Sequence, residues 1–323
     1  MSMEVIKAGI ADTFQDTGRY GHQHLGINPG GAMDLVAMHV ANALVRNELN
    51  EAVLELCFPA SVLLFKKPAL IAISGANFYA ELNGRPVPVN QSITVSAGTE
   101  LKFTKVAKGV FCYIAIHGGF SLSPWLNSNS TNQKAHAGGW NGRSLQKGDV
   151  IEFKNDVSII DETKMFPWRA NVFDFYKEAE NIQFLRGLEF DWLHSSSQEK
   201  LMKEFFTMTR VRDRMGYRLK GDVLSKQHGE LISTSATFGT VQLLPDGQLI
   251  ILMADHQTTG GYPRVAQVIA ADRSKLVQIN VGERISFRKI SLQDAEDLLL
   301  LQRKMLKQIQ ITCTVHLKDF FNP

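Results

Sequence analysis

Short apolar runs separated by glycine, proline or polar turns dominate the pattern of this chain. They are rich in β-branched and aromatic residues and too short for most helices, which is typical of strands. The clearest runs cover residues 69–74, 110–116, 150–153, 241–244, 249–253 and 264–270. The pattern therefore predicts a mainly β protein with a few helices.

One short phrase recurs near the ends of both halves. GTELKF (98–103), GDVIEF (148–153) and GERISF (282–287) each begin with glycine, alternate polar and apolar residues, and end on phenylalanine. A period of two after a turn glycine indicates a half-buried strand that leaves a tight turn. The copies suggest two related β domains.

Three segments have a helical pattern instead. Residues 33–44 carry an apolar face after a Pro-Gly-Gly breaker, residues 197–206 follow a serine-rich cap, and residues 295–309 follow a capping box of Ser291 and Asp294. The least strand-like stretch, 161–177, marks the predicted boundary between domains 1–165 and 166–323. Because no Gly/Ser-rich linker separates them, we expect the two domains to pack together.

Composition excludes several classes of protein. A net charge of +3 without a long basic run argues against a nucleic-acid binder. We expect no secretory signal, because the N-terminus lacks a long apolar stretch, and no run is long enough to cross a membrane. Three widely spaced cysteines indicate buried thiols and a cytoplasmic location. Motifs for a Walker loop, a dinucleotide fold, a protein-held metal or a biotin carrier are also missing.

Two segments are richer in glycine and polar groups than a core needs, FQDTGRYG (14–21) and DHQTTGGYP (255–263). The second directly follows the apolar run 249–254, and polar loops at the ends of rigid strands commonly hold binding and catalytic groups. Gly-Gly pairs occur at 30–31, 118–119, 138–139 and 260–261. Each pair either makes a tight turn or exposes N–H groups to an anion, and the pair at 30–31 precedes a helix N-terminus.

Seven segments in order resemble one family: 12–34, 52–65, 72–78, 128–133, 138–149, 213–221 and 252–272, with QD-x-GR-x-G, GAMD and QTTGGYP as the most specific motifs. This is the 5-oxoprolinase C subunit family, also called allophanate hydrolase subunit 2 or KipA-type biotin-dependent carboxyltransferase. The resemblance covers about Val5 to about Ala295. It implies two cyclophilin-like β-barrel domains packed together.

The resemblance implies one component of an ATP-dependent cyclic amide hydrolase. We expect it to convert 5-oxo-L-proline into L-glutamate together with an A subunit, a KipI-like B subunit, and ATP with Mg²⁺ that is used in the complex. Two alternatives stay open: half of a biotin-dependent carboxyltransferase of the urea carboxylase type, and a non-catalytic regulator that binds a KipI-like partner. The chain departs from the family pattern at Asn129 and His256, where arginines are usual.

Side-chain chemistry assigns roles in this reaction. Asp255 or Asp16 is the predicted acid–base group, and Arg19 and Arg214 neutralise negative charge. The residues expected to bind anions or orient the substrate are Gln15, Gly30, Gly31, Gln257, Thr258, Thr259, Gly260, Gly261 and Tyr262. We further expect the loops that carry Arg19 and Thr259 to face one cleft.

Overall fold

The computed structural model describes residues 2–155, 162–227, 229 and 231–321. The chain divides into two compact units. Unit 1 contains residues 1–19, 34–174 and 303–323, and unit 2 contains residues 20–33 and 175–302. Both units are discontinuous in sequence, whereas the two predicted domains are continuous halves. Within the boundary stretch 161–177, Asp161 lies outside the described residues.

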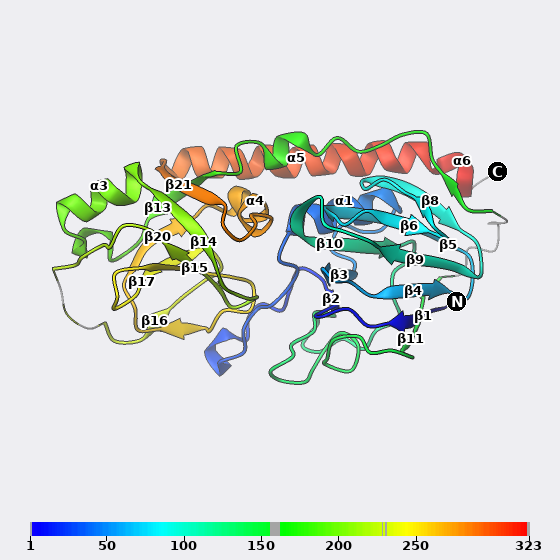
Figure 1. The fold of residues 1–323 in the computed structure, drawn as a ribbon, viewed down its shortest axis with the longest axis horizontal. Helices are drawn as coiled ribbons and strands as arrows, with labels where there is room; N and C mark the ends of the chain where they lie inside the picture. Colours follow the sequence, from blue (N-terminus) through cyan, green and yellow to red (C-terminus); the bar gives the residue numbers. More distant parts are fainter. Residues whose placement is uncertain (1, 156–161, 228, 230, 322–323) are drawn as a thin grey trace. The chain divides into compact units, whose positions relative to one another are not determined.

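Unit 1 is built on two six-stranded antiparallel sheets that share one core (Figure 1). The core lies between them because alternate side chains of the strands, such as Val5, Leu63, Ile71 and Ile114, point inward and are fully buried. In order, the first sheet contains β11 (Val150–Glu152), β1 (Ser2–Lys7), β4 (Val62–Phe65), β9 (Thr99–Phe103), β6 (Ala80–Leu82) and β7 (Arg85–Pro86). The second contains β12 (Lys164–Met165), β8 (Gln91–Val95), β5 (Ala69–Asn77), β10 (Lys108–Ile116), β3 (Val53–Cys57) and β2 (Thr13–Gln15).

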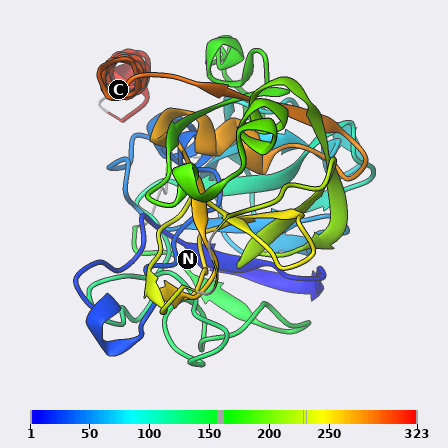
Figure 2. The same cartoon turned by 90° about the vertical axis from the view of Figure 1, so that its left-hand side faces the viewer.

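Unit 2 is built on a closed seven-stranded barrel, which Figure 2 shows from the side at the left of Figure 1. Phe184, Phe206 and Phe287 fill its interior, with ring centroids 5.6–6.0 Å apart along the series. Around the barrel run β13 (Asn181–Arg186), β20 (Arg264–Val268), β17 (Thr240–Leu243), β18 (Leu249–Leu252), β15 (Gly216–Lys220), β14 (Phe205–Arg212) and β21 (Arg284–Lys289). A small ribbon joins β16 (Thr234–Ser235) to β19 (Thr259–Gly260). The predicted mainly β class is confirmed, with a closed barrel in unit 2 and a two-sheet arrangement in unit 1.

Helices complete each unit. Helix α1 (Leu35–Leu44) packs on β5 and β10 of unit 1, and the Asp34 carboxylate caps it by accepting a hydrogen bond from the backbone N–H of Ala37. The short helices are η1 (Gln23–Leu25), α2 (Phe173–Tyr176), η2 (Phe190–Trp192), η3 (Ala270–Asp272), α4 (Arg273–Val277) and α6 (Lys318–Phe321). The predicted helix 33–44 is thus confirmed.

The other two predicted helices have different bounds. Helix α3 (Ser195–Lys203) ends before Phe206, which the prediction had included. Phe206 lies in β14 because its burial in the barrel interior outweighs its place in the helical pattern. Helix α5 (Leu292–His316) is longer than predicted, and Ser291 and Asp294 form the expected capping box at its start.

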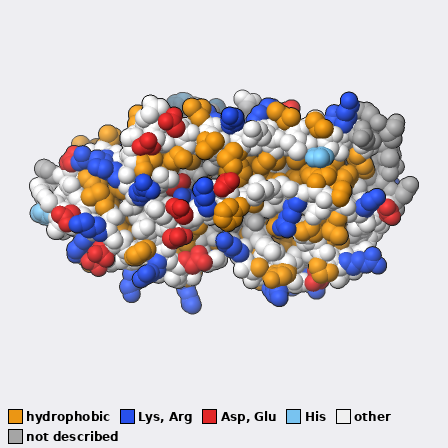
Figure 3. All heavy atoms as spheres, turned by 90° about the horizontal axis from the view of Figure 1, so that it is seen from above, with side chains coloured by type: hydrophobic (Ala, Val, Ile, Leu, Met, Phe, Trp, Pro, Cys, Tyr) orange, Lys and Arg blue, Asp and Glu red, His pale blue; other side chains and the backbone are white. Residues whose placement is uncertain are grey.

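Helix α5 carries exposed apolar side chains. It is seen end-on in Figure 2, and Figure 3 shows hydrophobic side chains on the face that carries it. Leu300, Leu301, Ile311 and Val315 are among the exposed large hydrophobic residues. No helix among the described residues is both long and apolar enough to span a membrane.

Candidate functional site

The Asp16 carboxylate holds two loops of unit 1 together. Its Oδ1 accepts hydrogen bonds from the backbone N–H of Gly18 at 2.7 Å and from the hydroxyls of Ser128 and Ser130 at 2.7 and 2.6 Å. Its Oδ2 accepts one from the backbone N–H of Asn129 at 2.6 Å. These four bonds occupy the carboxylate, so a catalytic role for Asp16 would require some of them to be exchanged.

Arg19 lies inside unit 1, with only 1% of its surface exposed. Its guanidinium lies over the Trp125 ring, 4.8 Å from the centroid, and donates a hydrogen bond to the backbone oxygen of Ser130. The guanidinium therefore packs against the same loop that Asp16 binds. Its predicted role in charge neutralisation stays a prediction.

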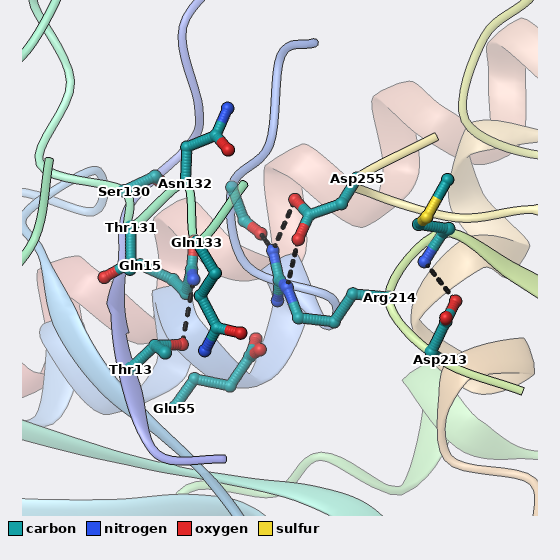
Figure 4. Close-up of polar contacts among 12 residues, drawn as sticks. Thr13, Gln15, Glu55, Ser130, Thr131, Asn132, Gln133, Asp213, Arg214 and Asp255 are labelled. Carbon is teal, nitrogen blue, oxygen red and sulfur yellow. Dashed lines mark hydrogen bonds and ion pairs between the residues drawn. The ribbon is translucent and has the colours of Figure 1, made fainter. Parts of the chain in front are cut away.

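Gln15 lies at the end of β2 among buried polar groups, which Figure 4 shows together with Thr13 and Glu55. Its Nε2 donates to Thr13 Oγ1 at 2.9 Å, and its buried Oε1 has no hydrogen-bond partner among the described residues. The Tyr113 hydroxyl donates to the Glu55 carboxylate at 2.7 Å and accepts from the backbone N–H of Asp34 at 2.8 Å. Burial beside these carboxylates raises the pKa of Tyr113.

Glu55 was missed by the sequence analysis. The sequence feature that could have identified it is a single carboxylate inside the otherwise apolar run 52–58. Charged groups are rarely buried unless they are paired, so this position indicates a specific polar contact.

In unit 2, Arg214 and Asp255 form a bidentate ion pair (Figure 4). Arg214 Nε donates to Asp255 Oδ2 at 2.7 Å and Nη2 donates to Oδ1 at 3.0 Å. Nη2 also donates to the backbone oxygen of Gly31 at 2.6 Å. The side chains are 18% and 23% exposed, so the pair is within reach of solvent. The fold thus brings together a predicted cation and a predicted acid–base group that are distant in sequence.

A cavity of about 370 Å³ is lined entirely by residues of unit 2, several of which neighbour this pair in sequence. Five predicted site residues line it: Gln257, Thr259, Gly260, Gly261 and Tyr262. The other lining residues, which sequence reasoning did not assign to the site, are Val211, Arg212, Asp213, Met215, Gly216, Gln242, Leu244, Ile250 and Leu252. Arg214, Asp255 and Thr258 are not part of this lining, and the Thr258 carbonyl accepts a hydrogen bond from the backbone of Ala236.

The four Gly-Gly pairs do not share one conformation. Both glycines have positive φ in the pairs at 30–31, 118–119 and 138–139, whereas neither Gly260 nor Gly261 does. Gly260 lies in β19, and a Cβ there would stand 2.7 Å from Gln242 Nε2. Close approach of Gln242, rather than left-handed backbone, therefore explains Gly260. The assignment of this pair and of Gly30 and Gly31 to anion binding stays a prediction.

His256 is 3% exposed, and its Nδ1 lies 2.7 Å from the backbone oxygen of Gln257. Burial lowers the pKa of His256, and the positive charge of Arg273 lowers it further. The described residues contain no group of three or more His, Cys, Asp or Glu side chains placed to hold a metal ion.

Residues 25–289 match the family model described as carboxyltransferase domain, subdomain A and B. The chain belongs to this family. It is 37% identical to the C subunit of the Haemophilus influenzae 5-oxoprolinase over 309 residues, which are 95% of this chain and 97% of the relative. It is 33% identical to the C subunit of the Escherichia coli 5-oxoprolinase, again over 95% of this chain and 97% of the relative.

Larger proteins of the family contain a similar region. The urea amidolyase of Lachancea kluyveri is 30% identical, but the match covers only 17% of that protein. The crystal structure of the K. lactis urea amidolyase superposes with a TM-score of 0.87 at 26% identity, over 95% of this chain and 20% of that one. The TTHA0988 structure gives a TM-score of 0.77 at 30% identity, over 89% of this chain and 55% of that one.

Proposed function

We propose that this chain is the C subunit of an ATP-dependent 5-oxoprolinase, which hydrolyses 5-oxo-L-proline to L-glutamate. The observation that carries the proposal is the match to two proteins of that name along nearly their whole length. The match to the Lachancea urea amidolyase covers less than a fifth of that protein, so the activity of urea amidolyases is a weaker guide to the function of this chain.

The chemistry explains why such an enzyme uses ATP. The lactam carbonyl is a resonance-stabilised amide, so transfer of the γ-phosphoryl group to its oxygen makes the carbon electrophilic. Water then attacks this carbon, the ring C–N bond breaks and the nitrogen takes a proton, which leaves the γ-carboxyl group of glutamate as an acyl phosphate. A second water hydrolyses this acyl phosphate to the carboxylate and inorganic phosphate. Groups that remove a proton from water and stabilise negative charge accelerate these steps.

Asp255 is our preferred acid–base group. Arg214 holds its carboxylate in a fixed position and supplies a positive charge beside it, and the pair is partly exposed. Asp16 is the second choice because four hydrogen bonds tie its carboxylate to its own loops. Gln257, Thr259 and Tyr262 would orient the substrate from the unit 2 cavity.

The proposal includes two partner proteins. We expect the site to be completed by the A and B subunits of the enzyme, with Mg²⁺ arriving on ATP, because magnesium is commonly bound through substrate phosphates. We also expect a cytoplasmic location. None of the three cysteines is in a disulfide, which matches a reducing compartment.

The family description favours one alternative, half of a carboxyltransferase that receives a carboxyl group from carboxybiotin. The test is to combine the purified chain with A and B subunits and supply 5-oxoproline, ATP and Mg²⁺. A parallel reaction supplies urea, bicarbonate, ATP and a biotin carboxylase with its carrier. Glutamate formation supports the proposal. Carboxylation of urea without glutamate formation would replace it with the alternative.

A further inference from the structure

Helix α5 has two unlike sides in the part that belongs to unit 1, residues 303–316. The side chains that pack on the unit are buried and recur at Leu306, Cys313 and Leu317. Lys304, Ile311 and Val315 each stand two positions earlier, about 200° around the helix, and are exposed. The outer side of a surface helix is normally polar. Ile311 and Val315 depart from that rule one turn apart, with exposures of 54% and 65%.

A cavity of about 300 Å³ opens beside this outer side, and all of its lining residues belong to unit 1. Helix α5 contributes Gln308 and Thr312 to the lining, and the segment 168–174 contributes the other wall. The Trp168 ring lies in this wall and stacks on His316, with ring centroids 5.2 Å apart. The stacking holds a flat aromatic surface at the cavity.

The cavity and the exposed apolar pair are continuous along the helix. Positions 308, 311, 312 and 315 are separated by three and four residues, so their side chains follow one another on one face. Lys304 and Lys307 precede Gln308 and Ile311 by four residues and extend the same face. We call positions 304, 307, 308, 311, 312 and 315 the α5 strip.

The α5 strip lies in a basic segment. From residue 298 to residue 318 the sequence has no acidic residue, and its cations are Arg303, Lys304, Lys307 and Lys318. Figure 3 shows hydrophobic and basic side chains together on the face that carries α5. Of the described residues that line the cavity, only Asp174 is acidic, and Arg169 lines it as well. The strip is therefore complementary to an apolar surface that carries carboxylates.

Charge and shape decide which occupant fits the α5 strip. A second copy that docked through the same strip would bring like charges together, which is unfavourable. A lipid bilayer offers a broad flat surface, whereas the cavity is a hollow that suits one protruding side chain. A protein segment with carboxylates and one large apolar side chain matches both the charge and the hollow.

We propose that the α5 strip and its cavity dock one of the partner subunits of the proposed enzyme. The partner inserts a large apolar side chain against Trp168 and places carboxylates near Lys304 and Lys307. Helix α5 lies outside residues 25–289, which match the carboxyltransferase domain, so this role is additional to that domain. The inference rests on the proposed function, because it takes its partner from that enzyme.

The test is calorimetric titration of the full chain with the purified A subunit and, separately, the purified B subunit. We expect wild type to bind at least one of them. Lys304→Glu combined with Lys307→Glu should weaken that binding by at least about tenfold, because repulsion replaces attraction. Lys108→Glu combined with Lys147→Glu is the matched control, since both lysines are exposed in unit 1 and the net charge changes equally. This control should bind like wild type.

A second pair of variants tests the apolar part of the α5 strip. Ile311→Ser combined with Val315→Ser should weaken binding by at least about tenfold. Val106→Ser combined with Val150→Ser removes two other exposed valines of unit 1, at 42% and 46% exposure, and should leave binding unchanged. Circular dichroism and melting temperatures confirm that each variant is folded.

The outcomes separate the docking site from the proposed function. If wild type binds neither subunit, if either strip variant in folded form binds as tightly as wild type, or if the charge control weakens binding equally, the docking site is wrong. Glutamate formation by the wild-type mixture in any of these cases leaves the proposed function standing, and its absence removes both. Strip variants that abolish a homodimer in sedimentation, or binding to phosphatidylserine vesicles, without weakening subunit binding would assign the strip to a second copy or a membrane instead.

Discussion

Replacing Asp16 with asparagine should destabilise unit 1 rather than only slow a reaction. The carboxylate accepts bonds from two backbone N–H groups and two serine hydroxyls. An asparagine that keeps its oxygen at the Oδ1 position turns its NH₂ toward the N–H of Asn129, where two donors meet. The serine hydroxyls can rotate, but this backbone N–H cannot.

The magnitude follows from that geometry. Loss of one charge-assisted hydrogen bond costs about 1.5–3 kcal/mol, and leaving its donor unsatisfied adds to this cost. We therefore expect Asp16→Asn to lower the free energy of unfolding by about 2–4 kcal/mol in urea titrations followed by fluorescence. Glu152→Gln, which removes an exposed carboxylate from β11 of the same unit, should change it by less than about 0.5 kcal/mol.

The same variants decide what Asp16 does. If Asp16→Asn is as stable as wild type and yet abolishes turnover in the complex, the carboxylate has a chemical role and the structural argument fails.

Three further predictions concern other residues. Asp255→Asn should lower turnover of the reconstituted complex by about 10²–10⁴-fold. It should lower the free energy of unfolding by only about 1 kcal/mol, since the ion pair is partly exposed and asparagine keeps one acceptor. Near-normal turnover of this variant would remove Asp255 from the mechanism. Gly260→Ala should lower the melting temperature in thermal-shift assays because its Cβ would stand 2.7 Å from Gln242 Nε2, whereas Gly261→Ala, with 3.4 Å to its nearest neighbour, should lower it less. Equal melting temperatures for the two variants would contradict the close-approach argument. Burial raises the pKa of Asp12 from 3.8 to about 6, so the folded state holds this proton more tightly than the unfolded state. Stability from Asp12 is therefore present below pH 4 and falls by about 3 kcal/mol as the pH rises through 6, and Asp12→Asn should flatten that decline in urea titrations at pH 4.5 and 7.

The strands were predictable because their signal is local. Glycines 98, 148 and 282 have φ of 79°, 88° and 86°, as the repeated phrase required, and strands follow each of them. Phe206 was wrongly predicted to be helical because its conformation depends on packing in the barrel interior. There its ring contacts Phe287 of a distant strand rather than its neighbours in sequence.

The site was predictable only in part. The segment 255–263 indicated a polar loop after a strand, and five of its residues line a cavity. The pairing of Arg214 with Asp255 and the burial of Glu55 depend on which strands become neighbours, which no local pattern specifies. Whether Arg19 and Thr259 face one cleft stays a prediction, since they belong to different units.

The most direct test of the proposed function is glutamate formation from 5-oxoproline by defined mixtures of the purified proteins with ATP and Mg²⁺. The A and B subunits together with this chain should form glutamate, while this chain alone and the two partners without it should not. Glutamate formation by this chain alone would contradict the requirement for partners. Equal glutamate formation by the two partners without this chain would contradict its place in the enzyme.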